Sequence, residues 1–292
     1  DEYDKPIIDH IENPTIAEQM RLILKEMYEV FKDAQVDSNV HFLFVTGVSK
    51  FSKVSLFSGV NNLNDLTIDD CTAALVGYTD AEVDQYLKGH IQALADKRDE
   101  PYQQTRDLLQ TWYNGYRFSK STVSVYNPFS LHNCLTKRDL DNYWFSSGTP
   151  DFLIKMFKKN PDTIKSLIKQ NVWGIASSDM EAFALEVYHE KIITLLLQTG
   201  YLTIRGYDSI ERNYTLDYPN REVRLSMTEQ IMELVAKIPK LTLGQFIARF
   251  TRALQADNIN EYCATFRDYL KLIPHNIIVD REKFFQSTFY AT

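Results

Sequence analysis

The chain is poor in the residue types that mark several classes of protein. Its 292 residues include three cysteines, 10 glycines and 9 prolines, and its formal net charge is −7. Cys71, Cys134 and Cys263 lie far apart without CxxC spacing, which favours reduced thiols over a disulfide framework or a zinc site. An acidic chain is not expected to bind nucleic acid or anionic membranes through its overall charge.

Long apolar runs and phosphate-binding loops are also absent from the sequence. No run approaches the ~18 apolar residues of a membrane-spanning helix, and the acidic start at Asp1 is unlike a signal peptide. We therefore expect a cytoplasmic protein without a membrane partner. No GxxxxGK[ST] sequence occurs, so the 292 residues lack the loop whose backbone N–H groups hold phosphates in many ATPases. No HExxH or GxSxG pattern indicates a metalloprotease or a serine hydrolase.

The composition otherwise suits a folded protein with a sizeable core. Apolar residues make up 44% and charged residues 24%, with 17 tyrosines and 17 phenylalanines. A chain of this length is expected to form two or three packed units. We place boundaries at residues 1–61, 62–184, 185–228, 229–280 and 281–292.

The first of these segments, residues 1–61, alternates between helix and strand patterns. Apolar residues recur at helical spacing from Thr15 to Asp33, and the apolar run His41–Gly47 suits a strand buried on both faces of a parallel sheet. A second short strand is predicted at Val54–Phe57. This alternation of helix and strand patterns is typical of an α/β core, and we expect residues 1–61 to begin partway through one. An incomplete sheet of this kind should leave apolar surface exposed near Val45, covered by another copy or by rearrangement.

The middle of the chain is predicted to be helical. Thr79–Glu82 is a capping box that begins a helix, and Tyr102–Tyr113 is expected to form another. The aromatic segment Trp112–Phe118 predicts core packing around a buried arginine rather than a surface for stacking bases. Tyr126-Asn127-Pro128 indicates a turn that leads into a further helix.

Residues 185–228 are expected to form a winged-helix-like unit. A helix ending at Gly200 precedes short strand patterns at 201–204, 214–216 and 222–225. Three arginines of this unit are candidates for contacts with DNA, and contact with another protein is the alternative that the acidic net charge favours. These residues are Arg205, Arg212 and Arg221.

Acidic residues at the start of the chain are the first candidates for catalysis. In many ATPases a strand ends in Asp-Glu, where the Asp assists Mg²⁺ and the Glu polarises the attacking water. Asp1 and Glu2 form such a pair, and Thr46 ends the predicted strand where a polar side chain can sense a phosphate. Lys50 and Lys53 follow that strand end and are either phosphate contacts or solvated loop residues. A metal-dependent hydrolase built from Asp1, Glu2 and Asp4 is a weaker alternative, because acids at a free terminus are poorly preorganised.

Several motifs together resemble those of one bacterial family. They are Asp1-Glu2-Tyr3-Asp4-Lys5-Pro6, Phe44–Ser55, Asn61-Asn62-Leu63, Trp112–Phe118, Tyr126-Asn127-Pro128 and Gly200-Tyr201-Leu202. In this order, and over nearly the whole chain, the sequence resembles the AAA-ATPase-like family of bacterial proteins that carry a C-terminal PD-(D/E)XK nuclease-like domain.

The resemblance implies a fold class and a set of site residues. Residues 1–61 would be the α/β remnant of a P-loop ATPase core, followed by a mainly α region with the winged-helix-like unit, and 281–292 would start the nuclease-like domain. Asp1 and Glu2 match the Walker B acids, with Asp1 as the metal ligand, and Asp4 of the same signature would contact the nucleotide. Thr46 matches the sensor position. Lys50 stands where the family carries Arg or Lys, a charge that acts across the subunits of a homo-oligomer. Asn114 replaces the family's Asp, which argues against a catalytic acid there.

The resemblance also implies a function for the parent protein. We expect the parent to bind and hydrolyse ATP with Mg²⁺ and to be coupled to a nuclease-like module that acts on nucleic acid. The 292 residues alone are expected to bind neither ligand, because they contain no phosphate loop. The alternative is a protein- or DNA-interaction scaffold that uses the winged-helix-like unit.

Overall fold

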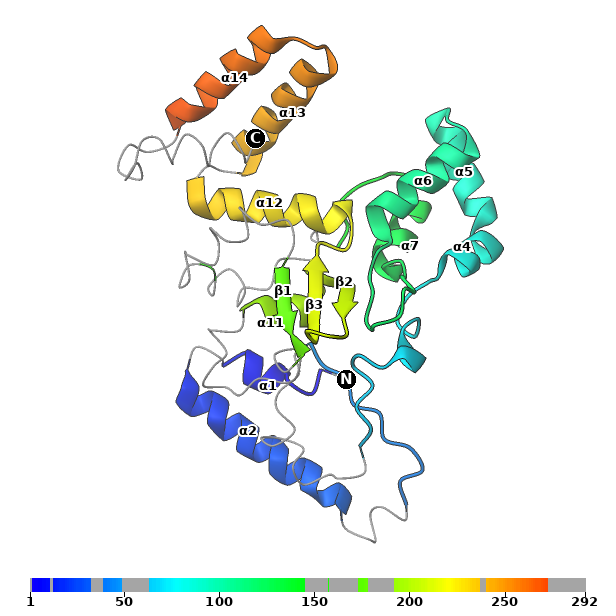
Figure 1. The fold of residues 1–292 in the computed structure, drawn as a ribbon, viewed down its shortest axis with the longest axis vertical. Helices are drawn as coiled ribbons and strands as arrows, with labels where there is room; N and C mark the ends of the chain where they lie inside the picture. Colours follow the sequence, from blue (N-terminus) through cyan, green and yellow to red (C-terminus); the bar gives the residue numbers. More distant parts are fainter. Residues whose placement is uncertain are drawn as a thin grey trace. The chain divides into compact units, whose positions relative to one another are not determined.

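The computed structural model describes residues 2–10, 13–32, 39–48, 63–144, 157, 173–177, 192–236 and 240–272. Over these residues the protein is mostly helical, with one small antiparallel sheet of three strands (Figure 1). The chain divides into two compact units, residues 1–160 with 172–224 and residues 161–171 with 225–292. Among the helices in the described part of the chain, none is both long and apolar enough to cross a bilayer.

The first unit begins with a short and a long helix. Helix α1 spans Lys5–Ile8, helix α2 spans Pro14–Glu29, and the 3₁₀ turn η1 follows at Val30–Lys32. The predicted helix from Thr15 to Asp33 is thus confirmed with small shifts at its ends. Asn13 determines the start, because its side chain accepts a hydrogen bond from the backbone N–H of Ile16 at 3.3 Å.

The run His41–Gly47 is not the predicted buried strand. Residues 40–48 have no regular secondary structure, and the side chains of Phe42 and Phe44 are 81% and 52% exposed. The two rings stack on each other with centroids 6.1 Å apart. The predicted apolar surface near Val45 is therefore present, although no sheet carries it. The prediction failed because apolar content specifies burial only when neighbouring strands are there to pair, and the sheet within the described residues is antiparallel and lies elsewhere. The predicted strand at 54–57 lies outside the described residues.

Residues 63–144 form a helical region with its own core. After the 3₁₀ turn η2 (Asp70–Thr72) come α4 (Asp80–Tyr86), α5 (Lys88–Arg98), α6 (Tyr102–Tyr113) and α7 (Pro128–Lys137). The predicted bounds of α6, the capping box before α4 and the start of α7 are confirmed. Side chains from all four helices meet in the core, among them Val83, Ile91, Leu94, Leu109, Tyr113, Tyr126 and Leu131.

The aromatic segment Trp112–Phe118 packs inward, as predicted. Tyr113 is fully buried and Tyr116 is nearly so. The buried arginine, however, is Arg106 on α6 rather than Arg117. Arg117 instead donates from its guanidinium to the backbone oxygens of Ser121 (2.7 Å) and Arg205 (2.6 Å).

The sheet contains strands β1 (Trp173–Ala176), β2 (Thr203–Asp208) and β3 (Asn213–Asp217), in the order β1-β3-β2. Helix α11 (Ile192–Gln198) leads into β2 through Gly200, whose φ of 81° lies in the left-handed region that glycine tolerates. The register of β2 on β3 shifts between Ile204 and Gly206.

The described residues do not show the predicted winged-helix-like unit. A helix followed by a two-stranded hairpin is present, but the strand expected at 222–225 is wrong, because these residues lie in helix α12 (Arg221–Ala236). The physical reason is a local helix start. The side chain of Asn220 accepts a hydrogen bond from the N–H of Val223 at 3.1 Å, and an acidic residue, Glu222, occupies the first turn.

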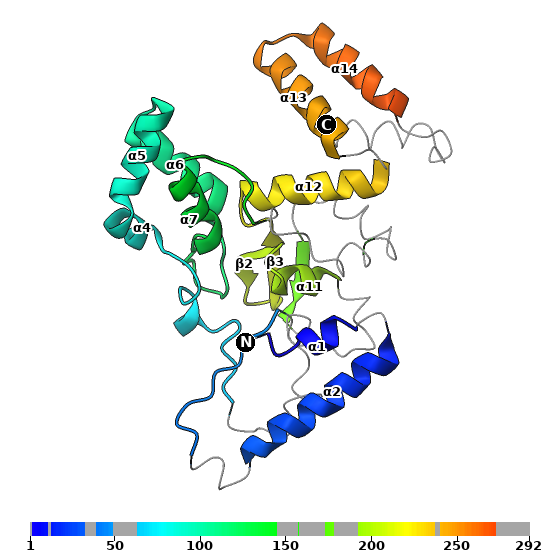
Figure 2. The same ribbon diagram turned by 180° about the vertical axis from the view of Figure 1, so that it is seen from behind.

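The second unit contains a pair of helices in its described part. Helices α13 (Lys240–Gln255) and α14 (Ile259–Leu272) lie side by side in both views (Figures 1 and 2). Phe250 and Tyr269 are buried between them. The turn is short, and Asp257 within it has a φ of 51°. The helical prediction for 229–280 agrees with this pair, and residues 281–292 lie outside the described residues.

Candidate functional site

The start of the chain lies against the segment that contains Thr46. The backbone N–H of Tyr3 donates to the carbonyl oxygen of Thr46 at 3.0 Å, and the Asp4 carboxylate accepts from the N–H of Val48 at 3.0 Å. Two parts of the chain more than forty residues apart are therefore joined by a backbone bond and a side-chain bond. The structure thus brings Asp4 and the backbone of Thr46, two of the residues that the sequence selects for one site, into one junction, and Glu2 directly precedes Tyr3 in the chain.

Gly47 is required for this close approach. A Cβ atom at this position would lie 2.5 Å from the Asp4 Oδ1 atom and 2.6 Å from the ring of Tyr3, distances that real Cβ atoms essentially never show. The absence of a side chain lets the backbone of residues 46–48 pass directly over Tyr3 and Asp4.

Asp4 and Glu2 differ in their exposure. Asp4 is fully buried, and its charge, after the effect of burial, raises the pKa of the nearby Tyr28 hydroxyl. Glu2 is exposed and has a φ of 50°, in the left-handed region, while Thr46 is half-buried. Asp4 therefore faces inward and positions the junction, and Glu2 is the acid that can meet a ligand from solution. Asp1, Lys50 and Lys53 lie outside the described residues.

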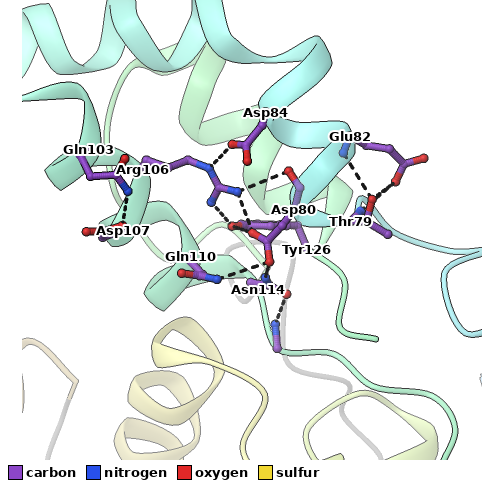
Figure 3. Close-up of polar contacts among 11 residues, drawn as sticks. Thr79, Asp80, Glu82, Asp84, Gln103, Arg106, Asp107, Gln110, Asn114 and Tyr126 are labelled. Atoms are coloured by element: carbon purple, nitrogen blue, oxygen red, sulfur yellow. Dashed lines mark hydrogen bonds and ion pairs between the residues drawn. The ribbon is translucent and has the colours of Figure 1, made fainter. Parts of the chain in front are cut away.

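A dense polar cluster surrounds Arg106 (Figure 3). Its guanidinium donates to Asp84 through Nε at 2.6 Å, to Asp80 through Nη2 at 2.7 Å and to the hydroxyl of Tyr126. The Cζ atom of the Arg106 guanidinium also lies 5.3 Å from the centre of the Tyr126 ring. Burial by itself lowers the pKa of Arg106, but the bonds to Asp84 and Asp80 outweigh it and the net shift is upward. Arg106 therefore stays charged and paired.

Asp80 is the centre of this cluster. Its Oδ1 atom also accepts from the Tyr126 hydroxyl at 2.8 Å, and its Oδ2 atom accepts from the amides of Asn114 (3.2 Å) and Gln110 (3.4 Å). Burial raises its pKa, and the bonds from Arg106 and Tyr126 more than offset that rise, so the pKa of Asp80 is lowered. Asn114 is thus a hydrogen-bond donor to Asp80.

A cleft of about 440 Å³ lies beside Arg106. It is open to solvent, and its lining is polar because three acids and two bases come from α4, α5 and α6. The lining residues are Asp80, Asp84, Lys88, Tyr102, Gln103, Arg106, Asp107 and Gln110. Among the described residues no group of three or more His, Cys, Asp or Glu side chains could hold a metal ion. The cleft is best explained by the ion pairs that join these helices.

The sequence identified Thr79–Glu82 as a helix start and Asn114 as a departure from a family pattern, but it did not predict the cluster. Arg106 and Asp80 are 26 positions apart in the chain, so no short sequence pattern predicts their ion pair. The one signal was the expectation of a buried arginine near the aromatic segment, which pointed to the right region and to the wrong residue.

Two of the three arginines predicted to contact DNA are held by intramolecular contacts. Arg205 donates to the carbonyl oxygens of Tyr218 (2.8 Å) and Pro219 (3.0 Å), and the guanidinium of Arg221 lies over the ring of Trp112 at 5.0 Å. Arg212 is exposed at the turn between β2 and β3, with a φ of 55°. Contact of these residues with DNA stays a prediction.

Comparison with known proteins concerns the start of the chain, where Tyr3 and Asp4 contact Thr46 and Val48. Residues 1–57 match the AAA-ATPase-like family, described as a predicted AAA-ATPase. The whole chain is 35% identical over 298 residues to an uncharacterised protein encoded in the vnfD 5′ region of Azotobacter chroococcum mcd 1. The alignment covers 54% of that relative, so the chain spans about half its length. No solved structure matches. The matched residues 1–57 thus include the junction of Tyr3 and Asp4 with Thr46 and Val48.

Proposed function

We propose that these residues are part of a protein that binds and hydrolyses ATP with Mg²⁺, and that the junction of Tyr3 and Asp4 with Thr46 and Val48 forms one side of its site. The observation that carries the proposal is the position of this junction. It lies inside the segment that matches a predicted AAA-ATPase, and it joins the acidic start of the chain, where the proposal places the catalytic acids, to the segment that contains Thr46. Because the chain spans about half of its relative, the activity of the whole protein is part of the proposal.

The proposal assigns roles to five residues. Glu2 polarises the attacking water, Asp1 binds Mg²⁺, and Thr46 senses the γ-phosphate. Lys50 contributes a positive charge to the site of a neighbouring copy in a homo-oligomer. Asp4 acts here as a positioning residue, because its carboxylate is buried and bonded to Val48; a direct contact with nucleotide stays a prediction from the sequence.

The described residues fit a magnesium–nucleotide ligand in part. Glu2 is exposed and Thr46 is partly accessible, as the proposed roles require. The inward-facing carboxylate of Asp4 does not fit a ligand role, and the 292 residues contain no GxxxxGK[ST] loop to hold the phosphates. The proposal therefore places the phosphate-binding loop in the part of the protein outside these residues.

Release of phosphate by the full-length protein tests the proposal. We expect Mg-ATP-dependent hydrolysis that falls roughly 100-fold or more in a Glu2→Gln variant, in line with the usual contribution of a general base, while ATP binding measured by calorimetry persists. The matched control is Glu26→Gln, which removes an exposed acid of helix α2 and should leave both measurements unchanged. Absence of Mg-ATP binding by the full-length protein would contradict the proposal, as would a Glu2→Gln variant that hydrolyses ATP at the wild-type rate.

The alternative, a scaffold that binds DNA or protein, has less support. It was predicted from a winged-helix-like unit, and the segment 222–225 that should complete the unit is helical. Salt-dependent binding of duplex DNA that is lost when Arg205, Arg212 and Arg221 are replaced by Ala would favour it over the ATPase. The coupling to a nuclease-like module stays a prediction.

A further inference from the structure

Helix α2, together with Val30 at the start of the following 3₁₀ turn η1, carries a wide apolar arc that is partly exposed. Five apolar residues, Ile16, Met20, Ile23, Met27 and Val30, follow one another at alternating spacings of four and three. This is the spacing of a seam between two packed helices. The last three side chains are exposed by 58%, 48% and 54%. We call Ile23, Met27 and Val30 the α2 stripe.

The rest of the arc packs within the same unit. Ala17 is fully buried, and Leu24 and Tyr28 are half-buried, with Tyr28 close enough to Asp4 for that charge to raise its pKa after the effect of burial. At about 100° per residue these side chains point roughly a quarter-turn or more away from the centre of the α2 stripe. One face of the helix is therefore already covered.

The solvent-facing side of α2 is a third, distinct face. Lys25 pairs with Glu29 at 3.9 Å, and each of the two side chains is about one-third exposed or more. A charged pair at a spacing of four is typical of a helix face in water. The α2 stripe is thus an apolar surface beside a normal polar face, and an amphipathic helix of this type usually buries its whole apolar arc.

The surrounding segment supplies little core for the stripe. Over the described residues 2–48 the buried apolar side chains are Ile7 and Ala17, whereas Phe42 and Phe44 are exposed. Secondary structure with an apolar face is stable when a second layer covers it. Among the described residues of this segment, no further apolar layer covers the stripe.

We propose that the α2 stripe is a docking surface for a helix that belongs to the same polypeptide but lies outside these 292 residues. The chain spans 54% of its relative, so a protein of that length has further residues available as the partner. The alternating four-and-three spacing favours a helix over a strand, because it forms the regular holes that side chains of a facing helix fill. This inference does not depend on whether the protein hydrolyses ATP.

The size of the surface favours an intramolecular partner over a second copy. Three partly exposed aliphatic side chains present on the order of 200–300 Å² of apolar surface. Stable complexes between separate chains bury ~800 Å² on each partner. A tethered segment has an effective concentration in the millimolar range, so a small apolar contact is enough to hold it.

Polar substitutions in the α2 stripe test this inference in two forms of the protein. A triple variant, Ile23→Gln, Met27→Gln and Val30→Gln, retains residues that suit a helix. The control triple, Ile210→Gln, Leu254→Gln and Ile259→Gln, replaces three apolar side chains that are at least as exposed. Both are made in the 292-residue chain and in the full-length protein, and hydrogen exchange of the α2 amides, thermal unfolding and sedimentation are measured.

In the full-length protein we expect the α2 amides of the stripe variant to exchange about tenfold faster than those of the wild type and of the control triple, because local opening becomes easier. In the 292-residue chain the same variant should unfold at the wild-type temperature. Equal exchange in the stripe and control variants of the full-length protein would overturn the inference. A lower unfolding temperature of the stripe variant in the 292-residue chain would also overturn it, because the stripe would then be part of that chain's own core. So would a dimer of the 292-residue chain that the stripe variant dissociates, because the occupant would then be a second copy.

Discussion

The guanidinium of Arg106 and the carboxylate of Asp80 meet at 2.7 Å, and they join helix α6 to the start of helix α4. Arg106 is nearly buried, whereas the side chain of Asp80 is half-exposed. The same carboxylate accepts bonds from Tyr126, Asn114 and Gln110. One acid at a helix N-terminus thus gathers donors from α6, from the segment after α6 and from the segment before α7.

The two acids that pair with Arg106 should differ in their contribution to stability. Asp80 accepts four side-chain donors, whereas Asp84 accepts the bond from Arg106 Nε. An Asp80→Asn variant keeps one oxygen for Arg106 and Tyr126, but it removes the negative charge that pairs with nearly buried Arg106 and the oxygen that accepts from Asn114 and Gln110, at a cost of about 1–3 kcal/mol. An Asp84→Asn variant should cost less than about 1 kcal/mol, because its side chain is largely solvated. Urea unfolding of both variants measures the difference, and equal losses would contradict a central role for Asp80.

Glu222 provides a prediction for pH dependence. Its Oε1 atom accepts from Ser130 (2.9 Å) and from the backbone N–H groups of Tyr143 (2.7 Å) and Trp144 (2.9 Å), and the residue is fully buried. Burial raises its pKa above the ordinary value of 4.5, and the three bonds offset this only in part. A raised pKa in the folded state means that the protonated form is favoured there, so its stabilising contribution is present below pH 4.5 and is lost as the pH rises through the folded-state pKa.

A Glu222→Gln variant should therefore become more stable relative to the wild type as the pH rises above 4.5, since the neutral amide oxygen can accept the same bonds. Glu82 is the control with the opposite sign. The N–H of Thr79 donates to its carboxylate and lowers its pKa, so the stability of the wild type relative to Glu82→Gln should rise with pH below 4.5 and stay level above it. Thermal unfolding of both variants between about pH 3 and 8 measures the Glu82 slope below pH 4.5 and the Glu222 slope above it. A wild type that gains stability over Glu222→Gln above pH 4.5 would show that the Glu222 prediction is wrong.

Local signals in the sequence predicted local structure, but they did not predict contacts between distant parts of the chain. The capping box of Thr79 and Glu82 and the cap of Asn127 involve residues within three positions of each other, so a sequence pattern can identify them. Asn220 carried the same kind of signal, but an alternation of apolar residues suggested a strand at 222–225 and the cap was missed. Competition between two local patterns, rather than a lack of pattern, caused that error.

Long-range relationships could be predicted only in part. The resemblance to a family placed Glu2 and Thr46 in one site, and the structure joins Tyr3, the neighbour of Glu2, to Thr46 without the predicted strand between 41 and 47. The Arg106 cluster was not predicted, because the ion pair of Arg106 with Asp80 depends on how α4 and α6 cross. Burial of Asp4 is a similar case, since a carboxylate in a catalytic motif was expected to face a ligand.

The junction at Gly47 should fail when a side chain is added. A Gly47→Ala variant places a Cβ atom 2.5 Å from Asp4 Oδ1, so the bond between Asp4 and the N–H of Val48 has to lengthen or break. We expect faster hydrogen exchange at Val48, and the same effect in an Asp4→Ala variant that lacks the acceptor. Asp4→Asn keeps an acceptor oxygen and should stay close to the wild type. If Gly47→Ala left the exchange rate of Val48 unchanged, the close packing described for this junction would be incorrect.

Among the glycines of the first unit that the structure describes, Gly115 should be the least tolerant of substitution. Its φ is 108°, and a Cβ atom would lie 2.0 Å from the carbonyl oxygen of Pro219, which is backbone and cannot rotate away. Gly115→Ala therefore has to separate the segment after α6 from the start of α12, and we expect a loss of roughly 2–4 kcal/mol in unfolding free energy. Gly89→Ala in helix α5 is the matched control, because its Cβ would meet no atom within 4 Å. That substitution should be neutral or should stabilise by up to about 1 kcal/mol, since Ala favours helix over Gly. Urea unfolding of the two variants decides the matter: similar free energies would mean that the approach of Gly115 to Pro219 does not hold these segments together.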